Sequence, residues 1–343
     1  MGGPGVFGSG VVWGAMSGHC LCKFVVRAAL ALPLVASVWP AAALEEITYL
    51  VPAPVELPNQ GPLVVAKALG LYAKGGYDVT FLTARGGVDV AKQVGVGNAP
   101  IGNALGDTSI IVRANGVPVR TVAVQGAGSL SIVVARTDRG IRTLTDLKGK
   151  TVAALSYQDT SFYALLGMLA TVGLAKNDVN IEAAGPSNST LTLEGSADAC
   201  MCAPDGEVRL EDGLPGVVVA MPANQYFPAM SQAVVASDAT IKEHPELVRA
   251  MVRGTLAGMK MIVDDPAGAA KTYAAAVESW KGREAEVERI FRKLDERSYT
   301  PQTHPGAMDA VRLAQLQDFY LREGIIERAS PVADLYTNEF VGN

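Results

Sequence analysis

Histidine and cysteine are scarce in this chain of 343 residues, which has three histidines and four cysteines. Beyond residue 43, only His244, His304, Cys200 and Cys202 remain. The two histidines are far apart in the sequence, so they predict neither a metal cluster nor a nucleophile–base pair. Two cysteines that lie two positions apart do not easily meet disulfide geometry. We therefore expect a chain without a metal, a cofactor or a disulfide.

Long basic runs are also missing. The chain has 29 lysine and arginine residues against 34 aspartate and glutamate residues, for a net charge of −5. The basic residues occur singly or in pairs, so a nucleic-acid surface is not expected. No apolar run beyond residue 43 is long enough to span a membrane.

The N-terminal segment has the pattern of a secretory signal. A basic segment, an apolar run and small residues follow one another: Lys23 with Arg27, then Ala28–Val38, then Ala41–Ala43. We expect residues 1–43 to be a signal peptide cleaved near Ala43, with the mature protein in the periplasm. Met16 is an alternative start. The competing interpretation, an uncleaved membrane anchor, needs a longer apolar run.

Strands and helices are expected to alternate along the mature chain. Expected strands are Ile47–Val51, Val79–Leu82, Pro100–Asn103, Val119–Val124, Ser131–Arg136, Thr151–Leu155, Val179–Ala183, Ala197–Met201, Val217–Ala220 and Gln232–Ala236. Expected helices are Pro62–Leu69, Asp89–Val96, Thr108–Asn115, Phe162–Val172 and a helix around Thr190–Glu194, with later helices starting at Pro245 and Pro266. This alternation is typical of an α/β fold with mainly parallel sheets flanked by helices.

We expect two α/β lobes joined by two hinge strands. The chain would cross between the lobes near Ser129–Arg136 and again near Met230–Ala236, where no flexible Gly/Ser linker occurs. Lobe 1 would be discontinuous, with residues 45–134 plus 229–343, and lobe 2 would be residues 135–228.

Two glycine motifs and one cysteine pair fail as cofactor signals. Gly149-Lys150-Thr151 resembles the end of a phosphate-binding loop, but it precedes a strand and lacks the first glycine. Gly95-Val96-Gly97 follows a helix and fails the dinucleotide fingerprint. Cys200 and Cys202 point the same way from a strand, where buried packing is favoured over a redox or metal role at a pocket edge.

Polar side chains at the predicted strand ends form the candidate site. Ligands of open α/β sheets bind beyond the carboxyl ends of the parallel strands. The candidate ligand-binding residues are Asn59, Arg85, Gly86, Asn103, Asp107, Gln125, Ser156, Tyr157, Thr160, Ser161, Asn188, Asp205 and Tyr226. Val79–Ser109 would form one wall of the cleft and Ser156–Ser161 the other.

Two of these positions carry the sharpest expectation. Ser156–Ser161 opens the Phe162 helix, where free backbone N–H groups and hydroxyls make a site for an anion or a carbonyl group. Arg85 would add a bidentate contact to a carboxylate or sulfonate; its alternative is a solvated loop arginine.

The order of several short motifs resembles periplasmic substrate-binding proteins of ABC importers, in the nitrate, sulfonate, taurine and thiamine-pyrimidine precursor group. The motifs are ITYL (47–50), VAKALGLY (65–72), GGVDVAKQVGVGNAPIG (86–102), NGVPVR (115–120), DLKGKTVA (146–153), EGSADA (194–199), HPELVRAMVRG (244–254) and DDPAGA (264–269). DLYTNEF (334–340) is similar to the thiamine-pyrimidine branch. The resemblance covers residues 45–343. It implies a type II two-lobed fold that encloses its ligand and delivers it to a membrane permease.

That branch also contains a pyrimidine synthase that uses its own histidine and a lysine-bound pyridoxal phosphate. At the matching positions this chain has Ala104 and Thr108. The cysteine-rich run of the synthase would fall near Gln225–Ala233, which has no cysteine. Pyrimidine-binding members also stack an aromatic residue from the first loop, and Pro52–Gly61 has no tryptophan or tyrosine. Tyr157 or Tyr226 are the alternative stacking faces.

We therefore predict an exported, monomeric solute-binding protein without catalytic activity. It would capture a small polar or anionic organic molecule between two lobes and pass it to an ABC permease. The alternatives are a synthase-like enzyme, a binding protein that serves a signalling receptor, and a binding fold used as a structural or interaction module. Nitrate, sulfonates, aromatic carboxylates, pyrimidines and flavin-like molecules are all open as ligands.

Overall fold

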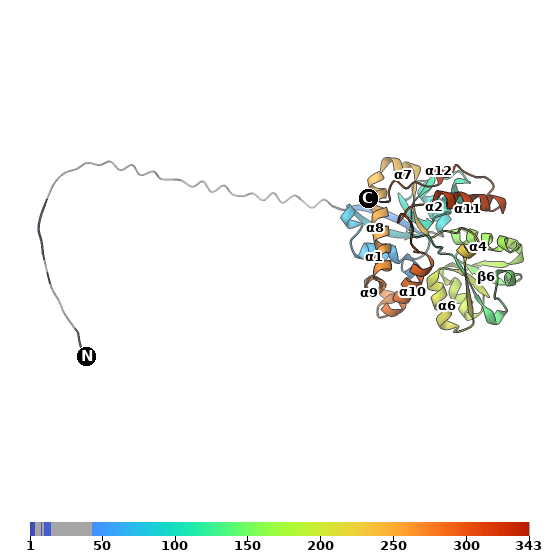
Figure 1. Ribbon diagram of the computed structural model, residues 1–343, viewed down its shortest axis with the longest axis horizontal. Helices are drawn as coiled ribbons and strands as arrows, with labels where there is room; N and C mark the ends of the chain where they lie inside the picture. Colours follow the sequence, from blue (N-terminus) through green and yellow to red (C-terminus); the bar gives the residue numbers. More distant parts are fainter. Residues whose placement is uncertain (4–7, 9, 15–42, 343) are drawn as a thin grey trace. The chain divides into compact units, whose positions relative to one another are not determined.

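The computed structural model of the chain describes residues 1–3, 8, 10–14 and 43–342. The chain from residue 43 to residue 342 belongs to one compact unit, and it is drawn in colour in Figure 1. Most of the predicted signal peptide, residues 1–43, lies outside the described residues, including Lys23, Arg27 and the apolar run Ala28–Val38. No helix in the described ranges is long and apolar enough to cross a membrane.

Two five-stranded sheets organise the compact unit. The first sheet contains β1 (Glu45–Val51), β2 (Tyr77–Thr83), β3 (Ile101–Leu105), β4 (Val119–Val124) and β10 (Gln232–Ser237). The second sheet contains β5 (Ile132–Arg136), β6 (Thr151–Ala154), β7 (Asn180–Ala183), β8 (Ala199–Cys202) and β9 (Val218–Pro222). We call the parts of the chain built on these sheets lobe 1 and lobe 2.

The two sheets have the same strand order. It is β2-β1-β3-β10-β4 in the first and β7-β6-β8-β5-β9 in the second. In each sheet the strand that enters from the other lobe, β10 or β5, is antiparallel to both of its neighbours. The β1–β2, β1–β3, β6–β7 and β6–β8 pairs are parallel. The predicted fold class, two mainly parallel sheets joined by two crossing strands, is confirmed.

Helices cover the sheets, and the colours of Figure 1 separate the green and yellow elements α4, β6 and α6 from the orange helices α8, α9 and α10. The helices that follow parallel strands in the chain are α1 (Gly61–Ala68), α2 (Gly87–Gly95), α3 (Thr108–Arg113), α4 (Thr160–Thr171), α5 (Asn188–Glu194) and α6 (Pro204–Gly213). The later ones are α7 (Asp238–Glu243), α8 (Pro245–Asp264), α9 (Pro266–Ala276), α10 (Glu284–Arg297), α11 (Ala310–Arg322) and α12 (Val332–Leu335). A short 3₁₀ helix, η1 (Pro58–Gln60), precedes α1.

Local capping explains several helix starts. Prolines stand in the first turn of α8 and α9, as predicted, because the missing N–H has no partner there in any case. The Asp265 side chain caps α9 by accepting from Gly268 N. Asp159 caps α4 in the same way, accepting from Ser161 N.

Helix α6 is the main element that the sequence did not predict. Its first turn contains Pro204, Asp205 and Gly206, residues that are typical of turns. The helix forms because proline is favoured in a first helical turn and because Val208 and Leu210 are fully buried. Asp205 therefore lies on a helix, not in the loop where we expected it.

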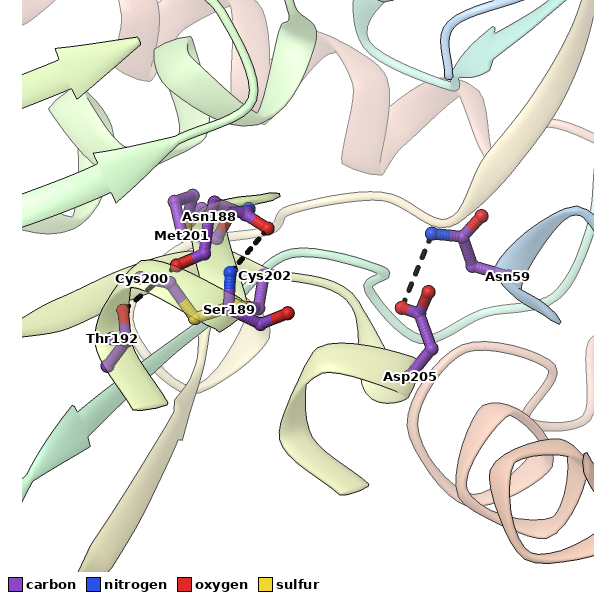
Figure 2. The surroundings of a disulfide bond; sticks show 8 residues. All are labelled: Asn59, Asn188, Ser189, Thr192, Cys200, Met201, Cys202 and Asp205. Carbon is purple, nitrogen blue, oxygen red and sulfur yellow. Dashed lines mark hydrogen bonds between the residues drawn. A yellow bond between two sulfur atoms is a disulfide. The ribbon is translucent and has the colours of Figure 1, made fainter. Parts of the chain in front are cut away.

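A disulfide joins Cys200 and Cys202 at the end of β8, and Figure 2 shows it beside Asn188 and Ser189. The expectation of a chain without disulfides is therefore wrong. The two residues project from the same side of the strand, and their Cα atoms are 5.4 Å apart. That separation lies within the range of ordinary disulfides, so the spacing did not exclude the bond.

The C-terminal end of α10 packs against the first crossing between the lobes. Gly128 N donates to Ser298 O at 3.1 Å, and Ser129 N donates to Arg297 O at 3.1 Å. A Cβ atom at Gly128 would lie 1.9 Å from Arg297 O, so this approach requires glycine. Nearby, Glu207 of α6 is buried and paired with Lys293 at 3.2 Å and with Arg297 at 2.8 Å. Lobe 2 is thus tied to α10 beside the crossing.

Candidate functional site

A cleft lies between the two lobes and takes in about 980 Å³, including the part that opens to solvent. Lobe 1 lines it from the loop after β1, from the end of β3 and from α10. Lobe 2 lines it from the end of β8 and from the starts of α4, α5 and α6. The crossing segments contribute Leu130, Ser131 and Gln232. The cleft is therefore at the carboxyl ends of the parallel strands of both sheets, where α/β proteins bind ligands.

A chain of amide hydrogen bonds runs from the interior of lobe 1 to Asp205 in lobe 2. Gln125 Nε2 donates to Asn103 Oδ1 at 3.1 Å, and Asn103 Nδ2 donates to Gln60 Oε1 at 3.0 Å. Gln60 Nε2 donates to Asn59 Oδ1 at 3.0 Å, and Asn59 Nδ2 donates to Asp205 Oδ1 at 3.3 Å. Because an ionised carboxylate only accepts, Asp205 sets the direction in which every amide of the chain faces.

The Asn59–Asp205 bond, drawn as a dashed line in Figure 2, joins the two lobes between residues that line the cleft. We call it the η1–α6 contact. Burial raises the pKa of the Asp205 carboxyl, and hydrogen bonds from Gly206 and Asn59 oppose the rise. Arg209, one turn further along α6, lowers the pKa of Asp205 as well. Because burial destabilises the charge of the Asp205 carboxylate, a further hydrogen-bond donor that enters the cleft would stabilise that charge.

The lobes also touch where the first turn of α2 meets the start of α4. Gly87 N donates to Asp159 Oδ2 at 2.9 Å, and Val88 N donates to Gln158 O at 3.0 Å. Ser156 Oγ donates to Arg85 O at 2.5 Å. A Cβ atom at Gly86, whose φ is +117°, would lie 2.6 Å from Asp159 Cα. We call this the α2–α4 contact; it comprises Arg85–Asp89 and Ser156–Thr160.

The thirteen predicted site residues separate into groups. Those that line the cleft are Asn59, Ser161, Asn188 and Asp205. Asn103 and Gln125 lie behind the lining, in the amide chain. Those in the α2–α4 contact are Arg85, Gly86, Ser156 and Thr160, the last of which is hydrogen-bonded to Thr108 at 2.7 Å. The polar residues predicted from their position at strand ends thus include both residues that line the cleft and residues that hold the lobes together.

Three predicted residues lie away from the cleft lining. Tyr157 is half-exposed and donates its hydroxyl to Ile181 O at 2.8 Å. Tyr226 packs against the largest hydrophobic cluster. Asp107 is buried, and Tyr320 donates to its Oδ2 at 2.6 Å. Burial raises the pKa of Asp107 to about 6. Neither tyrosine is placed as a stacking face of the cleft.

The structure does not bring the expected anion contacts together in the cleft. The Arg85 side chain is 73% exposed and pairs with Asp89 at 3.4 Å. The N–H group of Ser161, expected to be free, donates to Asp159 Oδ1 at 2.9 Å. Asp159 is the helix cap of α4, and capping uses the very N–H group that an anion would need.

Several lining residues were not predicted. They are Gln60, Ser131, Ser189, Arg209, Gln232, Trp280 and Glu286. Asp159 lies within the predicted wall Ser156–Ser161 but was not a candidate residue by itself. Trp280 and Glu286 come from the C-terminal helical region, where no strand end marks the position. Ser131 and Gln232 stand at the crossings, where the sequence reads as strand. The one signal that could have identified Ser131 and Gln232 is that each is a polar residue within a segment where the chain was expected to cross between the lobes.

Comparisons with known proteins agree on one kind of fold. The family model described as NMT1/THI5 like matches residues 57–269. The riboflavin-binding protein RibY of Chloroflexus aurantiacus is 24% identical over 287 residues, which is 82% of each chain. The alkanesulfonate-binding protein SsuA of Xanthomonas axonopodis pv. citri, bound to MOPS, superposes with a TM-score of 0.69, at 19% identity, over 87% of this chain and 99% of that one. The nitrate-binding protein NrtA of Synechocystis PCC 6803 superposes with a TM-score of 0.67, at 12% identity, over 87% of each chain.

Proposed function

Because the chain belongs to the NMT1/THI5-like family, we propose that it is an exported solute-binding protein of an ABC importer. It captures a small organic molecule in the cleft between its lobes and delivers it to a membrane permease. In this proposal residues 1–43 are the removed signal peptide and the mature protein works in the periplasm as a monomer. Lobe 1 is residues 45–134 plus 229–343, and lobe 2 is residues 135–228.

The observation that carries this proposal is the composition of the cleft. It is lined by both lobes, by Leu130 and Ser131 of the first crossing segment and by Gln232 at the start of β10, so a ligand bound there contacts both lobes and the connections between them. Domain closure around a ligand has this geometry, with the change of angle confined to short connecting segments. The likeness to proteins named for binding riboflavin, alkanesulfonate and nitrate supports the same mode of action.

The two positions that would carry the lysine and the histidine of the synthase hold Ala104 and Thr108. Ala104 is buried at the end of β3 beside the cleft. Thr108 is fully buried, accepts from Leu105 N at 3.1 Å and is hydrogen-bonded to Thr160. An alanine and a hydrogen-bonded threonine supply neither a Schiff-base amine nor an imidazole. This supports a binding protein over a pyridoxal enzyme.

A thermal-shift screen tests the proposal. The mature protein, freed of co-purified ligand by unfolding and refolding, is heated with riboflavin, cytosine, benzoate, MOPS or nitrate. A ligand at a hundred times its Kd stabilises the folded state by about 2.7 kcal/mol. We expect at least one probe to raise the melting temperature and to reduce the radius of gyration in X-ray scattering.

A matched pair of variants locates the binding. Ala203→Phe fills part of the cleft and should abolish the shift, whereas Ala267→Phe, on α9 and away from the cleft lining, should keep it. Melting temperatures that stay unchanged with every probe would contradict a solute-binding function.

A further inference from the structure

At the N-termini of α2 and α4, hydrogen-bond donors are engaged by the protein itself. An α-helix begins with N–H groups that lack intrahelical partners and carry partial positive charge, so they bind anions. In α2, Gly87 N donates to Asp159 Oδ2 at 2.9 Å. The next two N–H groups of α2, those of Val88 and Asp89, both donate to Gln158 O. In α4, Ser161 N and Ser161 Oγ both donate to Asp159 Oδ1.

Asp159 therefore stands where an anionic ligand would be held. Its carboxylate is buried, it bridges the first turns of α2 and α4, and both of its oxygens are hydrogen-bonded. The glycines opposite allow this approach, because a Cβ atom at Gly86 would meet Asp159 and one at Gly87 would lie 2.5 Å from Thr160 Oγ1. An external anion would have to displace an internal one.

The charges that line the rest of the cleft are also mainly negative. Asp159, Asp205 and Glu286 contribute carboxylates, of which Glu286 is paired with Arg283, and Arg209 is the one basic residue in the lining. Arg209 is exposed at the rim, where Nη1 donates to Thr190 Oγ1 at 3.3 Å. A negatively charged ligand would thus enter a desolvated space with more like charge than opposite charge around it.

Two polar groups of the lining have hydrogen-bonding capacity to spare. Ser131 Oγ is buried and has no hydrogen-bond partner within the described part of the chain. Asp205 is half-buried and accepts from the backbone N–H groups of Asp205 and Gly206, and Asn59 is its one side-chain donor among the described residues, at 3.3 Å. Buried polar groups of folded proteins are normally paired. A ligand that donates to Asp205 and pairs with Ser131 would complete both.

The remaining wall is apolar. Leu57, Leu130, Met201 and Ile290 line it together with Pro186. Apolar walls with a few placed polar groups are typical of sites for organic molecules with a sizeable hydrophobic body.

We propose that the ligand of this cleft is an uncharged or cationic organic molecule with an apolar body and a hydrogen-bond donor for Asp205, and that inorganic and sulfonate anions are excluded. The inference rests on the proposed function, since it names the chemistry of the molecule that the binding protein captures. It also separates this chain from the structural neighbours named for alkanesulfonate and nitrate.

Matched probe pairs, each with an uncharged and an anionic member, test the ligand class. The pairs are riboflavin with riboflavin 5′-phosphate, nicotinamide with nicotinate, and uracil with orotate, with MOPS and nitrate added as lone anions. Thermal shifts confined to the uncharged members support the inference. A larger shift from an anion than from its uncharged partner overturns the inference and leaves the binding function standing. No shift from any probe counts against both.

Substitutions on α6 then test the role of Asp205, using the best-binding probe in calorimetry. Asp205→Asn removes the charge in the cleft and should weaken that probe about tenfold or more, because hydrogen bonds to charged groups are the stronger ones. Asp212→Asn, on the same helix but paired with Arg289 outside the cleft, should leave the affinity unchanged. Equal affinities of the wild type and Asp205→Asn would remove Asp205 from the site.

Discussion

The α2–α4 contact and the η1–α6 contact both join the two lobes, and they differ in how completely their polar groups are used. In the α2–α4 contact, backbone N–H groups, a buried carboxylate and two glycines fit together with little room between them. In the η1–α6 contact a single bond of 3.3 Å links Asn59 to Asp205, which also lines the cleft. The first holds the lobes, and the second has capacity left for a ligand.

This difference shows that the position of a polar residue at a strand end does not decide its role. Arg85, Ser156 and Thr160 met every positional criterion for ligand contact, and they lie in the contact that is already satisfied. Asp205 met the same criterion and lies where hydrogen-bonding capacity remains. The two sets differ in whether their hydrogen-bond donors and acceptors are already paired within the folded protein.

The largest expected effect comes from Gly86→Ala, which breaks the α2–α4 contact. The new methyl group would meet Asp159 Cα at 2.6 Å in a backbone conformation that other residues rarely adopt. Overpacking and backbone strain together should lower the free energy of unfolding by about 4 kcal/mol, as measured by urea denaturation.

Gly97→Ala is the matched control, because Gly97 also has a positive φ but nothing within 4 Å of its Cβ position. Its cost should be about 1 kcal/mol, from the backbone alone. Equal losses in the two variants would show that the close approach to Asp159 does not stabilise the protein.

The second effect concerns the negative charge of Asp107, which is buried behind the α2–α4 contact. Burial raises the pKa of Asp107 to about 6, from an ordinary value of 3.8, and the Asp159 carboxylate adds to the rise. The folded protein thus keeps this proton to a higher pH than the unfolded chain does. Stability is therefore fully present below about pH 4 and falls as the pH rises through 6.

Asp107→Asn should remove that loss while keeping the bond from Tyr320. We expect the variant to match the wild type at pH 4 and to be about 3 kcal/mol more stable at pH 8, in urea denaturation at both pH values. A difference that is the same at pH 4 and pH 8 would rule out the ionisation of Asp107 as its cause.

The smallest effect compares one carboxylate from each contact. Asp159→Ala removes a helix cap and the acceptor of Gly87 N, and should cost about 2 kcal/mol. Asp205→Ala should change stability by about 0.5 kcal/mol, because the favourable position in the first turn of α6 is offset by the cost of burial. Thermal unfolding of the two variants without ligand measures both, and a loss for Asp205→Ala as large as that for Asp159→Ala would erase the distinction.

The alternation of apolar runs and turn residues was sufficient to predict each of the ten strands in the described chain and the two crossings between sheets. Strands such as β4 and β10 are buried along most of their length, so their apolar runs are unambiguous. Helix α6 was missed because Pro204, Asp205 and Gly206 indicate a turn locally, and only the packing of Val208 and Leu210 makes a helix of them.

The site was less predictable than the fold. Asn59 and Asp205 are far apart in the sequence, and nothing local shows that they meet. The pairing of Asp159 with Gly87 depends on how the lobes lie against each other, which no periodic pattern encodes. Trp280 and Glu286 reach the cleft from helices that follow the second crossing. Polar residues that follow strands mark the edge of a sheet where a ligand can bind, but they do not show which helix of the other lobe faces that edge.

The strands that cross between the lobes lie inside the sheets: β5 is paired with β8 and β9, and β10 with β3 and β4. Neither crossing strand is able to slip along an open edge, so any change of angle is confined to the short segments 125–131 and 223–231. In the proposed function, the lobes determine which molecule is held, and these two segments determine how fast it enters and leaves. Selectivity and exchange rate therefore reside largely in different residues, with Leu130 and Ser131 of the first segment belonging to both sets.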